Sequence, residues 1–182
     1  MNIPNIITVI RFLLVPVTVN ALLEGRMGIA FAAFLAAGIS DGVDGWIARR
    51  FDMHTELGAY LDPLADKVLL VSVFVMLGYM GELPNWLVIA TVSRDALIVG
   101  GVTLSAIMGN PVAMRPLMVS KMNTVAQIAL ASAVLFELAV APGPDWLRSG
   151  LVVVVALLTG ASAAAYLFTW FRHMGGHGEG NA

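Results

Sequence analysis

Long apolar stretches alternate along this sequence with short connections in which glycine, proline and polar residues gather. Six stretches reach the roughly 20 residues that a helix needs to cross a bilayer; they cover approximately residues 3–23, 28–48, 58–80, 85–108, 119–141 and 147–171. Strands of a membrane barrel alternate apolar and polar side chains, whereas residues 68–77 (VLLVSVFVML) carry apolar side chains on all faces. The pattern predicts an all-α, polytopic membrane protein with six transmembrane helices.

Composition supports this class of protein and excludes others. Of the 182 residues, 59% are hydrophobic and only 12% are charged, and the mean hydropathy is +0.86. A soluble domain of this size has too small an interior to bury so much apolar surface. The formal net charge of −2 lacks the basic excess of a nucleic-acid-binding protein. Without cysteine, a disulfide framework, a thiolate metal site and a cysteine nucleophile are excluded.

The chain is expected to form one catalytic domain over residues 1–174, followed by a disordered tail over residues 175–182 (GGHGEGNA). No Lys or Arg precedes the first apolar stretch, and Arg11 lies inside it. A secretory signal peptide has the opposite arrangement, with its positive charge before the apolar region. The first stretch is therefore predicted to be a structural helix.

The distribution of cations predicts the orientation in the membrane. Six spans place both chain ends on the same side. Five flanking cations fall on that side and two on the other: Arg49, Arg50, Arg115, Lys121 and Arg172 against Arg26 and Arg148. Because Lys and Arg are enriched in cytoplasmic loops, both termini are expected to face the cytoplasm.

Four aspartates stand out because a charged side chain in a membrane helix is costly. Asp41 and Asp44 are three residues apart, so they share one face of a helix. Asp62 and Asp66 are four residues apart and also share a face. The short connection between these helices makes them antiparallel neighbours whose carboxylates lie at the same end. Four carboxylates without His or Cys suit hard cations and are enough for two Mg²⁺ or Mn²⁺ ions.

A two-metal carboxylate site at the membrane face indicates phosphoryl-group chemistry on a lipid-linked substrate. Two other interpretations use the same residues. The aspartates could form structural ion pairs with neighbouring cations, namely Arg49, Arg50 and Lys67. They could also line the ion path of a cation transporter, although transporter sites lie near mid-membrane between repeated halves, and no repeat is visible here.

The run from residue 41 to residue 66 reads Asp41-x2-Asp44-Gly45-x2-Ala48-Arg49-x8-Gly58-x3-Asp62-x3-Asp66. It resembles the signature of the CDP-alcohol phosphatidyltransferases at all eight fixed positions, with the gaps intact. The resemblance implies the fold of that family, which has six spans and cytoplasmic termini. It also implies transfer of a phosphatidyl group from a CDP-linked donor to a hydroxyl acceptor, with release of CMP.

The resemblance implies roles for individual residues. Asp41, Asp44 and Asp62 hold the two divalent ions, and Asp66 faces these ions and acts as base on the acceptor hydroxyl. The donor (CDP) site takes Gly45, Ala48, Arg49 and Gly58, together with Asn5 and Thr8 of the opening segment. That segment resembles bacterial members, so the expected location is the bacterial cytoplasmic (inner) membrane. A homodimer is expected because family members form homodimers.

Two acceptors come into question, phosphatidylglycerol and glycerol 3-phosphate. The segments Ser93-Arg94-Asp95 and Ser120-Lys121-x-Asn123-Thr124-x2-Gln127 resemble the CMP-forming, cardiolipin-producing members. Members that use glycerol 3-phosphate more often have a Lys where this chain has Asn123, and a dianionic phosphomonoester favours such a second cation. The expected pair of substrates is therefore CDP-diacylglycerol and phosphatidylglycerol.

Three cations are candidate ligands for an acceptor phosphate: Arg94, Lys121 and Arg115. For Arg94 a second interpretation is a buried ion pair with the adjacent Asp95. For Lys67 the alternative to a site role is neutralisation of the nearby acids. Glu137 lies near the outer face and is expected to have no catalytic role.

Overall fold

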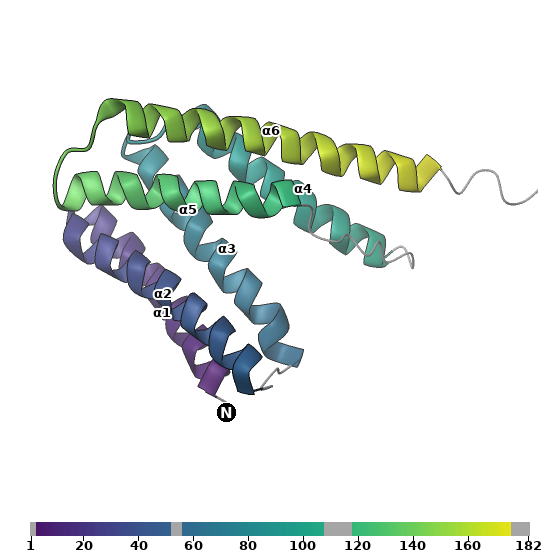
Figure 1. The fold of residues 1–182 in the computed structure, drawn as a ribbon, viewed down its shortest axis with the longest axis horizontal. Coiled ribbons are helices and arrows are strands. Elements are labelled where there is room, and N and C mark those ends of the chain that lie inside the picture. The colour runs from purple at the N-terminus through teal and green to yellow at the C-terminus, as the bar shows by residue number, and fades with distance from the viewer. Residues whose placement is uncertain (1–2, 52–55, 108–117, 176–182) are drawn as a thin grey trace, which may run out of the picture.

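A computed structural model of the chain describes the backbone of residues 3–51, 56–107 and 118–175 and the side chains of residues 10–40, 67–100 and 118–168. Over these backbone ranges it consists of six α-helices (Figure 1): α1 (Ile3–Leu23), α2 (Met27–Phe51), α3 (Glu56–Tyr79), α4 (Asn85–Ile107), α5 (Met118–Ala139) and α6 (Asp145–Gly175). The all-α prediction is confirmed. The observed bounds lie within four residues of the predicted ones, and the largest shift is the extension of α6 to Gly175.

Two helices are long and apolar enough to cross a membrane when only the described residues are considered. They are α5, over Met118–Ala139, and α6, over Asp145–Phe168. The described apolar parts of α1, α2 and α3 are shorter and cover Ile10–Leu23, Met27–Ser40 and Lys67–Tyr79. A fold with two membrane-spanning candidates among six helices is thus established, and six spans stay a prediction.

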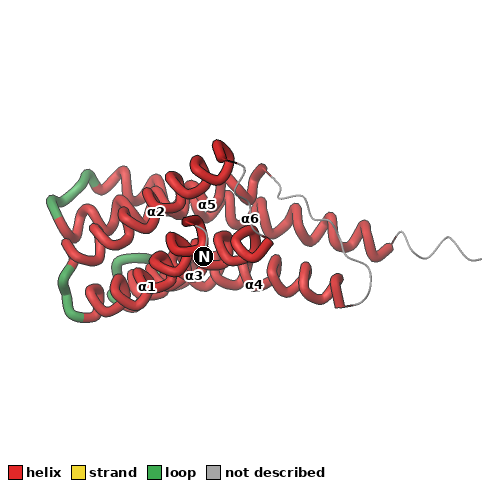
Figure 2. Tube along the Cα trace, turned by 90° about the horizontal axis from the view of Figure 1, so that it is seen from below, coloured by secondary structure: helices red, strands yellow, loops and turns green. Residues whose placement is uncertain are grey.

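The connections α1–α2, α3–α4 and α5–α6 lie at one end of the bundle, on the left in Figures 1 and 2. The first two contain glycines with positive φ, Gly25 (72°) and Gly81 (79°). After each glycine a backbone N–H donates back five residues into the helix, from Arg26 to Ala21 and from Glu82 to Leu77. This hydrogen bond satisfies a free carbonyl of the last turn, which explains why α1 and α3 end at these places.

The six helices divide into two groups. α1 packs along α2 and α3, while α6 packs along α5 and α4. In Figure 1 the first group slants away from α5 and α6 toward the end where α2 ends and α3 begins. Near the opposite end the groups are in contact, since the rings of Phe31 in α2 and Phe136 in α5 meet edge to face with centroids 5.9 Å apart.

The apolar core draws side chains from all six helices, and α3, α4 and α5 supply most of its fully buried members. Val73 and Leu77 of α3, Leu87 of α4 and Leu130 of α5 are all fully buried. Large apolar side chains also point outward along these helices, as the exposed Ile89 shows. An outer surface of this kind is typical of proteins that contact a membrane or another apolar partner.

Candidate active site

The two aspartate pairs lie on regular helix and flank the same connection. α2, which carries Asp41 and Asp44, ends at Phe51, and α3, which carries the other pair, begins at Glu56. Asp41 is ten residues before the end of α2 and Asp66 ten residues after the start of α3, which is about 15 Å along each axis at 1.5 Å per residue. The two helices are in contact, so the pairs lie at matching depths in adjacent helices.

This arrangement fits a site for divalent cations. The donors are carboxylates only, which suit hard ions such as Mg²⁺ and Mn²⁺, and two adjacent helices supply two carboxylates each. Within the part of the chain whose side chains are described, no group of three or more acidic or histidine side chains could hold a metal. The four aspartate side chains lie outside that part, so the metal assignment stays a prediction.

The predicted donor residues also fall on helices. Asn5 and Thr8 lie in α1, Gly45, Ala48 and Arg49 in α2, and Gly58 in α3. Their side chains are outside the described residues, and Arg115 is outside the described backbone as well.

Lys67 is the first described side chain after the second aspartate pair, and it connects α3 to α4. Its Nζ atom donates to Oδ2 of Asp95 at 2.8 Å. The side chain of Lys67 is 34% exposed and that of Asp95 only 10%. The contact that the structure describes for Lys67 is therefore an interhelical ion pair with α4. The side chains of the aspartate pairs lie outside the described residues, so neutralisation of those acids by Lys67 stays a prediction.

Asp95 has a second cationic partner, its neighbour Arg94. Nη1 of Arg94 donates to Oδ1 of Asp95 at 2.5 Å, so each carboxylate oxygen accepts from one cation. The guanidinium also donates from Nη2 to the hydroxyl of Ser120 in α5 at 2.6 Å, and from Nε to the hydroxyl of Ser162 in α6 at 3.1 Å. One arginine of α4 thus binds both other helices of its group.

The burial of Arg94 requires this many partners. Its residue is 3% exposed, and moving an ion of this size out of water costs several kcal/mol even after relaxation. Charge-assisted hydrogen bonds offset the cost, and the ring of Tyr166 adds a cation–π contact with its centroid 5.9 Å from the guanidinium carbon. Lys67, Asp95 and Arg94 together carry one net positive charge beside the acid-bearing end of α3.

A layer of buried amides continues from this charged cluster along α5. Asn123 is fully buried and accepts a hydrogen bond from the hydroxyl of Thr159 in α6 at 3.1 Å. Gln127, one turn further on, is 2% exposed. Its Nε2 atom has no hydrogen-bond partner in the described part of the structure. Of the α5 residues singled out in the sequence, Ser120 thus contacts α4 through Arg94, and Asn123 contacts α6 through Thr159.

The two described candidates for binding an acceptor phosphate, Arg94 and Lys121, lie in different environments. The interpretation of Arg94 and Asp95 as a buried pair is confirmed, and the guanidinium also donates to the hydroxyls of Ser120 and Ser162. Lys121 is exposed in the first turn of α5. The role of both cations as phosphate ligands stays a prediction. Sequence reasoning missed Ser162 and Tyr166, because α6 reads as an apolar helix.

Comparison with known proteins gives one family. A family model described as CDP-alcohol phosphatidyltransferase matches residues 1–171. A probable phosphatidylglycerophosphate synthase of Mycobacterium tuberculosis is 39% identical over 100 residues, which is 52% of this chain and 48% of the relative. The CMP-forming cardiolipin synthase of Homo sapiens is 30% identical over 189 residues, which is 94% of this chain and 61% of the relative.

A third relative, from Schizosaccharomyces pombe, is named a cardiolipin synthase (CMP-forming) / mitochondrial hydrolase fusion protein. It is 30% identical over 191 residues, which is 96% of this chain and 32% of that protein. The matched segment thus spans about half of the mycobacterial relative and less than two thirds of each of the other two.

Proposed function

The chain belongs to the CDP-alcohol phosphatidyltransferase family, and from that premise we propose that it is an integral-membrane phospholipid synthase with six transmembrane helices. The proposed reaction transfers the phosphatidyl group of CDP-diacylglycerol to phosphatidylglycerol and yields cardiolipin and CMP. The observation that carries it is the pair of acid-bearing helices, α2 and α3, with aspartates at matching depths beside one connection.

In the proposed step, a hydroxyl oxygen of the acceptor attacks the phosphorus of the phosphatidyl group. A new P–O bond forms while the P–O bond to CMP breaks, and CMP leaves with the bonding electron pair. The hydroxyl proton passes to the carboxylate of Asp66, which acts as general base. After proton transfer this carboxyl is neutral until it releases the proton to water.

The family is generally dependent on divalent metal ions. We assign Asp41, Asp44, Asp62 and Asp66 as the residues that hold two Mg²⁺ or Mn²⁺ ions. When bound, such ions neutralise the charge that develops on a leaving phosphate. The small Gly45 and Ala48 leave room for the nucleotide against α2, and Arg49 binds the donor phosphates through its planar fork of N–H groups; Gly58, Asn5 and Thr8 complete the donor site.

The choice of acceptor is supported by the human and Schizosaccharomyces pombe relatives, which cover most of the chain. Both carry cardiolipin synthase in their names, and they match 94% and 96% of the chain. The second candidate is a phosphatidylglycerophosphate synthase, which would use glycerol 3-phosphate, because the mycobacterial relative with this name has the higher identity over a shorter segment. A transporter that moves cations past the aspartates is a distant third candidate.

The charged cluster favours phosphatidylglycerol on chemical grounds. Among the described side chains, its two cations share one carboxylate, which leaves one formal positive charge on Lys67, Asp95 and Arg94. One positive charge matches the single negative charge of a phosphodiester better than the two charges of a phosphomonoester. We further propose that the protein lies in the bacterial cytoplasmic membrane with both termini in the cytoplasm. We also propose that it acts as a homodimer.

The test is CMP release by the purified protein in detergent with CDP-diacylglycerol, Mg²⁺ or Mn²⁺, and one acceptor at a time. We expect CMP release with phosphatidylglycerol and none when the divalent ion is chelated. Release with glycerol 3-phosphate alone would replace the first candidate by the second. If no alcohol supports turnover and the reconstituted protein carries cations across liposomes, the transporter is correct.

A further inference from the structure

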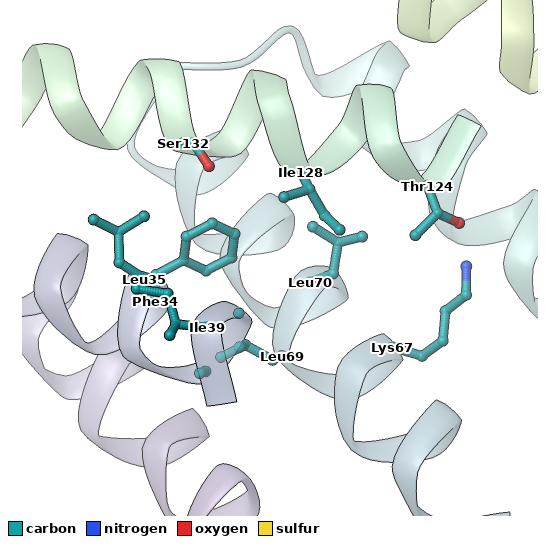
Figure 3. A pocket seen from close by; sticks show the side chains of 11 residues that line it. Phe34, Leu35, Ile39, Lys67, Leu69, Leu70, Thr124, Ile128 and Ser132 are labelled. Carbon is teal, nitrogen blue, oxygen red and sulfur yellow. The ribbon is translucent and has the colours of Figure 1, made fainter. Parts of the chain in front are cut away.

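A cavity of about 560 Å³ lies between α2, α3 and α5, where the two helix groups separate. Its volume falls within the range of small-ligand pockets. Figure 3 shows the side chains that line it, which include Leu35 and Ile39 of α2, Lys67 of α3, and Thr124, Ile128 and Ser132 of α5. The α5 residues follow each other at intervals of four, so they occupy one helix face.

The cavity is polar at one end and apolar along its walls. Lys67 directs its ammonium group toward the side on which the Thr124 hydroxyl lies (Figure 3). The ion pair with Asp95 uses one of the three N–H donors of this ammonium group. Asp95 is shared with Arg94, so Lys67 keeps charge and donors for a further anion at the cavity.

The apolar walls reach the outer surface of the bundle. Leu35, Ile39 and Ile128 line the cavity and are 38%, 65% and 44% exposed. A side chain in this position contacts the apolar phase of a membrane, and an acyl chain can enter the cavity from the same phase. A small water-soluble acceptor such as glycerol 3-phosphate has no apolar part that could occupy the space between these walls.

We propose that this cavity holds one acyl chain of the phosphatidylglycerol acceptor, with the phosphodiester group of that lipid against Lys67. The inference rests on the proposed function and names the site from which its lipid acceptor reacts. Charge complementarity supports it, because a phosphodiester is a single negative charge and the cluster of Lys67, Asp95 and Arg94 has one surplus positive charge. The apolar walls of the cavity match the apolar acyl chain of the lipid.

The position of Lys67 assigns the cavity to the acceptor rather than the donor. Lys67 directly follows Asp66, the proposed base. A phosphodiester bound at Lys67 is separated from the terminal hydroxyl of its glycerol headgroup by a few single bonds, so the hydroxyl can reach the adjoining turn of α3. The donor nucleotide belongs to the motif on α2, which begins beyond Ile39, the last cavity residue on that helix.

The experiment is photocrosslinking with phosphatidylglycerol that carries a diazirine in one acyl chain. The full-length protein is placed in nanodiscs of phosphatidylcholine without donor or divalent ion, so the readout does not depend on turnover. After irradiation, mass spectrometry locates the adducts. We expect adducts on the cavity-lining parts of α2, α3 and α5, and we expect unlabelled phosphatidylglycerol to remove them while phosphatidylcholine does not.

Matched variants test the two parts of the site. Ile128→Trp fills the cavity and is expected to remove the adducts, whereas Ile89→Trp, the same change at an exposed site on α4 outside the cavity, is expected to keep them. Lys67→Met is expected to weaken competition by phosphatidylglycerol about tenfold, as the loss of a hydrogen bond to a charged group predicts. Lys67→Arg restores it.

Three outcomes would overturn the inference. Adducts spread evenly over the outer helix faces would mean that the cavity is not a lipid site. Equal displacement by CDP-diacylglycerol and phosphatidylglycerol would assign the cavity to the donor. Turnover with phosphatidylglycerol that is unchanged in Ile128→Trp would show that the acceptor reacts from elsewhere, and in that case the proposed function stands while the inference fails.

Discussion

Lys67 of α3 and Asp95 of α4 face each other across the boundary between the two helix groups, with 2.8 Å between Nζ and Oδ2. Lys67 is one residue after Asp66, and Asp95 is one residue after Arg94, whose guanidinium binds α5 and α6 through serine hydroxyls. The acid-bearing helix is thereby tied to all three helices of the other group. A chain of charged contacts therefore sets the position of α3 relative to them.

Replacement of Asp95 tests how much this cluster contributes to stability. Asp95→Asn keeps the shape of the side chain but leaves Arg94 as a buried cation without its carboxylate. We expect a loss of about 3–5 kcal/mol in the free energy of unfolding, the usual effect of removing one partner of a buried ion pair. Denaturant unfolding in detergent, followed by fluorescence, measures the change.

An exposed pair provides the control for Asp95. Oε2 of Glu24 lies 3.1 Å from Nε of Arg26 in an ion pair, and both side chains are exposed. Glu24→Gln is expected to change the free energy of unfolding by less than about 1 kcal/mol, as for other surface pairs. Equal losses in the free energy of unfolding would show that the buried cluster stabilises the fold no more than an exposed ion pair does.

Close packing of α3 against α4 at Gly78 gives a second prediction. A Cβ atom built on Gly78 would lie 2.8 Å from Cγ2 of Val88, and valine is stiff about χ1. Gly78→Ala therefore has two opposing effects on the free energy of unfolding. It gains about 1 kcal/mol in helix propensity, but it overpacks the contact with Val88, which costs about 1–3 kcal/mol. In the Val88→Ala background the same substitution is expected to be stabilising.

The double-mutant cycle at Gly78 and Val88 measures this coupling directly. We expect Gly78→Ala to be more favourable by at least about 1 kcal/mol when Val88 is alanine. Gly160 of α6 is the control, because a Cβ atom there meets nothing within 4 Å. Gly160→Ala is expected to be unaffected by Val88→Ala, and a coupling near zero at Gly78 would contradict the close contact.

Arg148 joins three segments at the end of the bundle away from the aspartates. Its Nη2 donates to the Glu82 carboxylate at 2.7 Å and to the backbone carbonyl of the same residue, and its Nη1 lies 3.6 Å from Oε2 of Glu137. Arg148→Met is expected to lower the free energy of unfolding by about 1–2 kcal/mol, because charge-assisted hydrogen bonds are lost. It should leave kcat/KM of the folded protein unchanged.

Two measurements on Arg148→Met separate stability from activity. Unfolding in denaturant gives the stability, and initial rates of CMP release at a temperature well below unfolding give kcat/KM. Arg26→Met, at an exposed arginine of the same end, serves as the matched control and should change neither quantity. A fall in kcat/KM for Arg148→Met would mean that this end of the bundle takes part in turnover.

The helices could be predicted from the sequence because their signals are local. Apolar stretches of membrane length, interrupted by glycine and proline, place all six helices within four residues of their observed bounds. The observed helix ends differ from the predicted ones where helical backbone continues beyond the apolar stretch. α6 continues to Gly175 because nothing in the segment after Phe171 forbids helical backbone, although its side chains become polar.

The partners of the charged residues could not be predicted, because they depend on how helices pack. The buried pair of Arg94 with Asp95 was visible as adjacent charges, but its contacts with α5 and α6 were not. Thr159, Ser162 and Tyr166 are spaced three and four residues apart in an otherwise apolar helix. This spacing puts them on one face, and it is the signal that would have identified the partner face of α6.

The last prediction concerns the proposed base. Asp66→Asn removes the group that accepts the hydroxyl proton and one of the four carboxylates assigned to the ions. We expect the rate of CMP release to fall by a factor of about 10²–10⁴, the usual contribution of a general base. Binding of CDP-diacylglycerol by the α2 motif and by the ions that the remaining three aspartates hold is expected to be largely kept.

Turnover and donor binding must therefore be measured on the same preparation of Asp66→Asn. CMP release gives the rate, and calorimetry with CDP-diacylglycerol in detergent gives the donor affinity in the presence of Mg²⁺. Asp145→Asn makes the same chemical change at an exposed acid in the first turn of α6, at the opposite end of the bundle, and should keep both quantities. Because loss of a base slows the step without removing the donor, near-normal rates would refute the assignment of Asp66. Equal loss of rate and donor affinity would mean that its main role is to hold the ions.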